Sequence, residues 1–484
     1  MLLRKLIGCV FVLGWGLTLG LAGELRPTQQ TAVADVESRQ ELLKAVNKSI
    51  WEFAEVGLEE RRSSELLVSK LKQEGFEVKT GVSGMPTSFV ATFGSGKPVI
   101  GILAEYDALP GLSQKVEGDR VPVVEGAPGH GCGHSGLGTG ALGAAIAVKS
   151  ALQKHNIQGT LKVFGTPAEE TLIGKVYMLL DGQFDDLDVC LHWHPANKTG
   201  VWAGSSKAAA SVKFTFKGTA AHAAGSPEKG RSALDAVELM NVGVNFMREH
   251  IKEDARLHYV ITDGGGAPNV VPASATVWYY IRADKHKDVE NYFDWVQDIA
   301  KGAALMTRTK VSLQIETDCH ELVLNEPLNE MLHQALVSVG PPKFTDTERA
   351  LARRLQQPVI DEFGTSIKVA IEERVQTLQE AGEISKGSTD VGDISWYVPT
   401  AGLRVACFAA ESPGHSWQNV AAMGSTIGEK GMIVASKALA IATLDLFEKP
   451  ELVAAAKADW KQRMDGVKYT SLIPKGQKAP AKIR

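Results

Sequence analysis

The chain has 484 residues, with 52 lysines plus arginines against 56 aspartates plus glutamates, which gives a formal net charge of −4. Hydrophobic residues make up 44% and charged residues 22%, which is typical of a globular protein with a large core and excludes a disordered chain. The near-neutral balance lacks the basic surface that nucleic-acid binding requires, so no nucleic-acid partner is expected. The length suits roughly three domains of about 150 residues each, or one long α/β domain with an insertion.

Residues 1–22 are predicted to be an export signal. The basic pair Arg4 and Lys5 precedes an apolar stretch over 6–21, which ends in small residues at the spacing that a signal peptidase favours. The mature chain is therefore expected to begin near Gly23 and to be periplasmic or extracellular. The alternative is a retained membrane anchor, because the apolar stretch is close to the lower length limit for crossing a bilayer.

The first part of the fold, over 35–206, alternates helix and strand patterns. Amphipathic helices are expected over 41–55 and 63–75. Three apolar runs end in acidic residues or histidine, namely 98–110, 161–170 and 188–195. This alternation predicts an α/β domain with a mainly parallel sheet and helices on both faces. In such sheets ligands bind beyond the carboxyl ends of the strands, so the site is expected there.

A second domain is predicted over 207–320, where the order of elements becomes strand, helix, strand, strand, helix, strand. This is the order of the ferredoxin-like α+β unit, and it interrupts the first domain. The first domain resumes over 321–450 and closes with a helix. The C-terminal tail over 451–484 is expected to be loose from about residue 470.

The glycine-rich segment HGCGH offers His130, Cys132 and His134 at the start of a predicted helix. Imidazole and thiolate are the usual protein ligands of zinc-like ions. A thiol beside an imidazole is also how cysteine hydrolases are built. The segment alone therefore indicates chemistry and leaves both interpretations open.

Further polar side chains follow the other predicted strands. Glu169 and Glu170 are adjacent, so one carboxylate can bind a metal while the other serves as a general base; an isolated pair would be solvated surface glutamates. His192 and His194 point to the same face of an extended strand, so both can be ligands only with a local bend. His415 follows a later strand and could, by itself, be structural. Their gathering at strand ends predicts a polynuclear metal site.

Eight motifs in order over about residues 40–450 resemble one family: AEYDALPGL, GHGCGHS, TPAEE, LHWHP, GTAAHAAGSPEKGRSALDAV, GGGAPNVVPASA, GSTDVGD and SPGHSW. These motifs are similar to those of the metal-dependent amidohydrolases, which include N-acyl-amino-acid hydrolases, aminoacylases and glutamate carboxypeptidases. The resemblance implies a di-metal exopeptidase-like catalytic domain interrupted by a lid domain that also forms a homodimer. It implies two divalent ions, manganese or zinc, and leaves open a second, homologous subunit.

The resemblance also implies roles for individual residues. The implied metal ligands are Cys132, His134, Glu170, His192 and His415, with Cys132 bridging the two ions. Glu169 falls on the general base, and Asp107 on an acid that orients a ligand. His194 falls outside the ligand set and is assigned to packing or the substrate pocket.

The lid contributes His222, which in the family reaches the partner subunit's active site and stabilises the oxyanion, with Asn269 nearby. The chain departs from many relatives at Ser135 and Thr389, where acidic residues or asparagine are common. Neither departure is a predicted ligand, but both affect the expected substrate pocket.

The function implied is hydrolysis of the amide bond of an N-acyl amino acid, with p-aminobenzoyl-glutamate or a related aminoacyl-glutamate favoured. A dipeptidase and a general aminoacylase of the same family are alternatives. Two rivals come from other classes, a cysteine hydrolase that uses Cys132 and an exported, non-catalytic solute-binding protein. The presence of Glu169 argues against the binding protein, which would not need a base.

Overall fold

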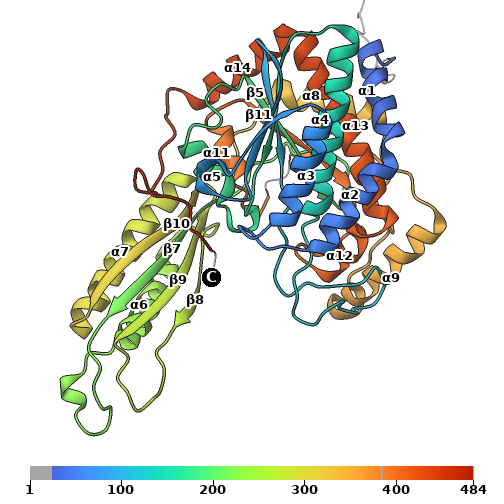
Figure 1. Ribbon diagram of the computed structural model, residues 1–484. Coiled ribbons are helices and arrows are strands. Elements are labelled where there is room, and N and C mark those ends of the chain that lie inside the picture. The colour runs from blue at the N-terminus through green and yellow to red at the C-terminus, as the bar shows by residue number, and fades with distance from the viewer. Residues whose placement is uncertain (1–23, 383–384, 483–484) are drawn as a thin grey trace, which may run out of the picture.

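The computed structural model describes residues 24–382 and 385–482. A seven-stranded sheet forms the centre of one domain, and a four-stranded sheet forms a second domain that projects from one end of it (Figure 1). The export signal expected over 1–22 lies outside the described residues. Among the residues that are described, no helix is long and apolar enough to cross a membrane.

The large sheet is parallel at its centre and antiparallel at its edges. Its strands are β1 (Glu77–Thr80), β2 (Phe89–Ser95), β3 (Val99–Ala104), β4 (Gly159–Gly165), β5 (Val189–Ala196), β6 (Gly200–Val201) and β11 (Thr400–Ala406), in the order β1-β2-β4-β3-β5-β11-β6. Strands β4, β3, β5 and β11 pair in parallel. All six residues of β3 are buried, as expected for a strand covered on both faces. The parallel strands bring their carboxyl ends to one edge of the sheet.

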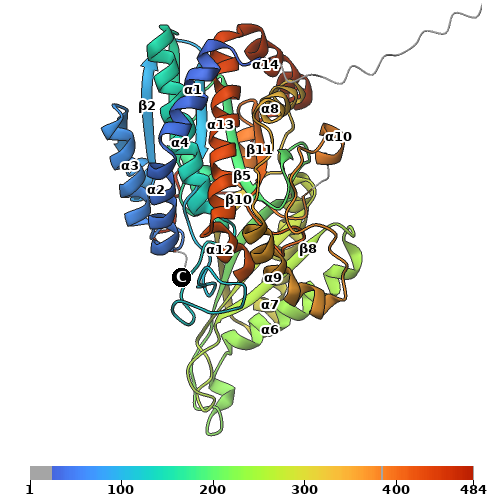
Figure 2. The same cartoon turned by 90° about the vertical axis from the view of Figure 1, so that its right-hand side faces the viewer.

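Helices cover both faces of this sheet, as predicted. One face carries α1 (Pro27–Ser38), α2 (Gln40–Phe53), α3 (Arg61–Gln73), α4 (His134–His155), α8 (Glu326–Val339) and α13 (Thr426–Glu448). Figure 2 shows α1, α4 and α13 side by side over that face. The other face packs against α5 (Gly174–Leu180) and α11 (Val391–Ser395). The remaining helices of this domain are α9 (Asp346–Phe363), α10 (Leu378–Ala381), α12 (Trp417–Met423) and α14 (Pro450–Met464).

The second domain has the predicted ferredoxin-like order. It consists of β7 (Ala208–Lys217), α6 (Ala233–Met247), β8 (Arg256–Asp263), β9 (Ser274–Ala283), α7 (His286–Thr307) and β10 (Lys310–Cys319). Its strands lie in the order β10-β7-β9-β8, all antiparallel. Alternate residues of β9 are buried, which is the pattern of a sheet with helices on one face only.

The C-terminal tail is packed and not loose. After α14 the chain returns to the junction of the two domains and ends beside β10 (Figure 1). The backbone N–H of Leu472 donates to Asp318 Oδ2 at 2.6 Å, and Gln477 Nε2 donates to the carbonyl oxygen of Ile315 at 2.6 Å. The tail therefore joins the two domains, which is a long-range contact that local composition does not reveal.

Candidate metal centre

The carboxyl ends of the central strands bring the predicted site residues together. Glu105 and Asp107 follow β3, Glu169 and Glu170 follow β4, and His194 lies near the end of β5. Cys132 and His134 come from the turn that begins α4. Within this cluster, three combinations of side chains have their ligand atoms within 4.8 Å of one another: Cys132–His134–His194, Cys132–Glu170–His415 and Glu105–His134–Glu169.

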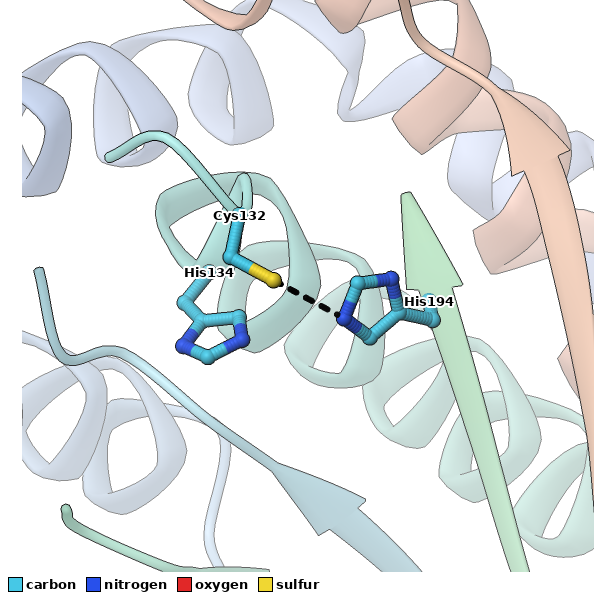
Figure 3. Close-up of side chains that lie close together, drawn as sticks. All are labelled: Cys132, His134 and His194. Atoms are coloured by element: carbon cyan, nitrogen blue, oxygen red, sulfur yellow. Dashed lines mark hydrogen bonds between the residues drawn. The ribbon is translucent and has the colours of Figure 1, made fainter. Parts of the chain in front are cut away.

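The first group surrounds Cys132, whose Sγ lies 3.3 Å from Nε2 of His194 (Figure 3). His134 lies beside both, and its ring meets that of His194 edge to face. Gly133 between the cysteine and His134 has a φ of 83°, and a Cβ there would lie 2.9 Å from Pro195. Glycine is therefore required for the turn that aims both ligands at the same point.

The second group links Cys132 to Glu170 and His415. Nε2 of His415 lies 3.3 Å from Oε2 of Glu170. His415 has a left-handed φ of 52°, a conformation that costs energy for a residue with a side chain and is frequent at functional sites. Because Cys132 belongs to both this group and the group of His194, its thiolate is placed to bridge two ions.

The third group places Glu169 apart from Glu170. Nε2 of His134 lies 3.7 Å from Oε2 of Glu169 and 3.4 Å from Oε2 of Glu105. The short 3-10 helix that holds the two adjacent glutamates is bounded by Ala168 and Leu172, whose φ angles are 55° and 60°. These two strained residues turn the neighbouring carboxylates toward different partners.

Asp107 fixes the orientation of the ligands. Its Oδ1 lies 2.8 Å from Nδ1 of His134, and its Oδ2 accepts the backbone N–H of Glu170 at 2.9 Å. A carboxylate on Nδ1 holds the imidazole in the tautomer whose Nε2 carries the free lone pair. Asp107 thus has the position that the sequence assigned to it.

The donor set fits divalent metal ions. Three of its buried atoms have no hydrogen-bond partner within the described residues, namely Nε2 of His134, Oε2 of Glu105 and Oε1 of Glu170. Burial raises the pKa of Glu170 to about 8 and raises the pKa of Glu169 well above its ordinary value, with the charge of Glu105 adding to the second shift. A cation among them would satisfy the free atoms and let both carboxylates ionise.

The protonation of Cys132 separates the metal hypothesis from the cysteine-hydrolase hypothesis. Burial, and then the charge of Glu170, raise the pKa of this thiol to about 12. A nucleophilic cysteine needs a lowered pKa, whereas a bound ion deprotonates a thiol outright. The geometry therefore favours Cys132 as a ligand over Cys132 as a nucleophile.

His192 lies away from these groups, although the sequence analysis assigned it as the ligand. Its ring packs against Gly402, where a Cβ would lie 2.3 Å from the imidazole, and against Trp202. Burial lowers its pKa to about 3. The structure thus brings His194, two residues further along the strand, to Cys132.

His222 and Asn269 lie together on the lid. The backbone N–H of Ala223 donates to the carbonyl oxygen of Asn269 at 3.0 Å, and both predicted side chains are exposed. The loop between β7 and α6, which carries His222, forms the end of the lid farthest from the large sheet (Figure 1). Within one chain, His222 is therefore not part of the cluster around Cys132.

Two charged residues at the site were not identified from the sequence. Glu105 sits two residues before Asp107 in the same strand-end motif, and its second oxygen contacts Lys175 of α5. A signal was present, because a lone lysine in the apolar helix GKVYMLL is unusual. No spacing rule connects this lysine to a distant glutamate.

A fourth group lies at the domain junction and does not have the geometry of a metal site. His286, Asp318 and His320 have close ligand atoms, but the two imidazole rings stack with centroids 3.6 Å apart and planes 14° apart. An ion lies in the plane of each imidazole that binds it, so two stacked rings cannot share one. The pairing of His286 with Asp318 is structural.

Comparison with known proteins agrees with this geometry. The model of the peptidase dimerisation domain matches residues 205–306. The chain is 40% identical to one of the subunits of p-aminobenzoyl-glutamate hydrolase of Escherichia coli, over 91% of this chain and 96% of that protein. It is 27% identical to Xaa-Arg dipeptidase of Mus musculus, over 92% and 94% of the two chains.

Solved structures show the same fold. A dinuclear metal-binding peptidase of the M20 family from Bacillus subtilis superimposes with a TM-score of 0.55 at 17% identity, covering 85% of this chain and 99% of that one. An aminobenzoyl-glutamate utilization protein from Klebsiella pneumoniae gives 0.57 at 18% identity, covering 85% and 97%. The chain belongs to the M20 peptidase family, whose members are metallo-hydrolases of amide and peptide bonds.

Proposed function

We propose that this protein hydrolyses the amide bond of N-acyl amino acids, with p-aminobenzoyl-glutamate as the favoured substrate. The 40% identity to the E. coli p-aminobenzoyl-glutamate hydrolase chain over nearly the whole length supports the substrate. The observation that carries the chemistry is the division of two adjacent carboxylates. Glu170 faces His415 and Cys132, whereas Glu169 faces His134 and Glu105.

Five residues would hold two divalent ions, manganese or zinc: Cys132, His134, Glu170, His194 and His415. Two ligand atoms at about 2.1 Å from one ion, at angles between about 90 and 109°, lie about 3.0–3.4 Å apart. The 3.3 Å separations of Cys132 from His194 and of Glu170 from His415 agree with that range. When bound, the ions supply Lewis-acid polarisation of the scissile carbonyl and acidify the attacking water.

Glu169 is placed to move the proton. It is buried and free of the group of His415 and Glu170, so its carboxylate can take a proton from the attacking water and pass it to the leaving nitrogen. His134 stays fixed by Asp107 through this step. The chain therefore offers a base and ligands as separate groups.

We also propose a homodimer formed through the lid. Strand β8 lies at the edge of the lid sheet with Val260 and Ile261 exposed, and α6 exposes Val242 and Phe246. An exposed apolar edge strand is a pairing surface, and the dimerisation-domain match covers this region. Such a dimer would bring the loop of His222 to the partner's metal centre, where its imidazole would stabilise the developing oxyanion.

Export is proposed on the apolar stretch over 6–21 alone. Amino-terminal sequencing of the native protein tests it. A start near Gly23 outside the cytoplasm supports export, and an intact Met1 in the cytoplasm contradicts it.

The substrate is tested by a hydrolysis screen of the purified chain with manganese or zinc supplied. p-Aminobenzoyl-glutamate, N-acetyl amino acids and Xaa-Arg dipeptides are compared by kcat/KM. Highest turnover of p-aminobenzoyl-glutamate supports the proposal, and preference for dipeptides favours the activity named for the mouse relative. Because the E. coli relative is named as one subunit of its enzyme, activity of the purified chain alone also shows that no second, different chain is needed.

A further inference from the structure

Lys175 is a fully buried ammonium group beside the metal centre. Its Nζ lies 2.6 Å from Asp390 Oδ1 and 2.8 Å from Glu105 Oε1. Its backbone N–H also donates to Asp390 Oδ2 at 2.9 Å. Lysine is almost never fully buried unless it is paired. Asp390 therefore anchors Lys175 at both its backbone and its side chain, so that the ammonium is held at one position against Glu105.

The second oxygen of Glu105 points into the cluster. Oε2 is buried, lacks a hydrogen-bond partner within the described residues, and lies 3.4 Å from Nε2 of His134, which is also unpartnered. That separation falls within the range of about 3.0–3.4 Å expected for two ligands of one ion. Lys175 thus occupies one oxygen of Glu105 and leaves the other facing the free nitrogen of His134.

We propose that Lys175 is a positioning residue of the metal centre, which holds Glu105 so that its Oε2 joins His134 on one of the two ions. The proposal rests on the proposed function for the presence of those ions. Glu105 then acts as a further ligand, and Asp390 sets the position of Lys175.

A role in charge balance alone makes the opposite prediction about metal affinity. If Lys175 only neutralised Glu105 and Asp390, its removal would leave more negative charge near the ions, and divalent cations would bind as tightly or more tightly. If Lys175 positions Glu105, its removal releases the carboxylate, and the ions bind more weakly. The sign of the change separates the two roles.

The experiment titrates manganese into chelator-treated protein by calorimetry and records thermal unfolding of the same samples. Lys175→Met is expected to weaken manganese binding about 10- to 100-fold, the usual effect of losing a group that orients a ligand. Lys175→Met combined with Asp390→Asn restores the charge balance, so it should regain much of the unfolding midpoint but not the affinity. Affinity that is unchanged or higher in Lys175→Met, or restored in the double variant, overturns the proposal.

A double-mutant cycle tests whether Lys175 acts through Glu105. Glu105→Gln should weaken manganese binding by itself, and adding Lys175→Met should then cause little further loss. Lys457→Met is the matched control, because it removes an ion pair with Asp188 away from the site, and its affinity should equal that of the wild type. Full additivity in the cycle contradicts the proposal.

Glu105→Gln carries the test if Lys175→Met does not fold, and wild-type affinity in Glu105→Gln overturns the proposal. A wild-type chain that binds no manganese or zinc rejects the metal centre itself, and this proposal with it. Normal binding by the wild type together with unchanged variants rejects only the role of Lys175.

Discussion

Nε2 of His194 lies 3.3 Å from Sγ of Cys132, whereas His192, on the same face of β5, packs against Gly402. The parallel strands on either side make the difference, because a residue deep in the sheet is surrounded by backbone and one near its edge faces the site. This relationship selects which histidine of the HWH sequence can bind a metal.

His194→Ala is expected to lower the metal content and kcat strongly, because it removes the ligand opposite Cys132. His192→Ala is the matched control and should keep the metal, with some loss of stability from the cavity that it leaves. Metal analysis of the two purified variants decides between them. Metal loss in His192→Ala with normal content in His194→Ala would restore the assignment made from the sequence.

The two adjacent glutamates should fail in different ways. Glu169→Gln removes the base, so turnover should fall by about 10²-fold or more while the metal is retained. Glu170→Gln removes a ligand beside His415, so metal occupancy should fall as well. Parallel measurement of kcat and metal content checks this, and near-normal turnover in Glu169→Gln would remove it from the role of base.

His222 should act on the partner's site. His222→Ala is expected to lower kcat by roughly 10²- to 10³-fold, the usual cost of losing an oxyanion donor, with metal content intact. Mixing His222→Ala with Glu169→Gln subunits should restore part of the activity, because some mixed dimers then contain one complete site. Two variants that remain inactive after verified subunit exchange would rule out a shared site.

The domain junction should be pH-sensitive through His286. Burial lowers the pKa of His286, but the hydrogen bond and charge of Asp318 outweigh burial, so the pKa is raised overall. A raised folded-state pKa adds stability below the ordinary histidine value of about 6.5, and this stability is lost as pH rises through the folded-state pKa. The difference in free energy of unfolding between wild type and His286→Gln should therefore shrink from about pH 6 to about pH 9. Urea denaturation measures it, and a constant or growing difference would contradict the assignment.

Much of the fold followed from local patterns. The alternating elements and the β-α-β-β-α-β order predicted both sheets, because each pattern has few ways to bury its apolar face. The strand-end motifs also predicted which segments meet. The sequence could not decide between His192 and His194, since depth along a strand depends on its neighbours. Lys175 and the packed tail escaped for a related reason, because their partners are distant in the chain.

The most direct test of the two-ion centre is removal and return of the metal. Purified protein is assayed on p-aminobenzoyl-glutamate and N-acetyl amino acids before chelation, after chelation, and after addition of manganese or zinc, with the ions per chain counted at each stage. The expected result is two ions per chain, loss of activity together with them, and recovery of both on addition. Full activity in protein shown to carry no ion, with loss on alkylation of Cys132, would contradict the metal centre and establish a cysteine hydrolase.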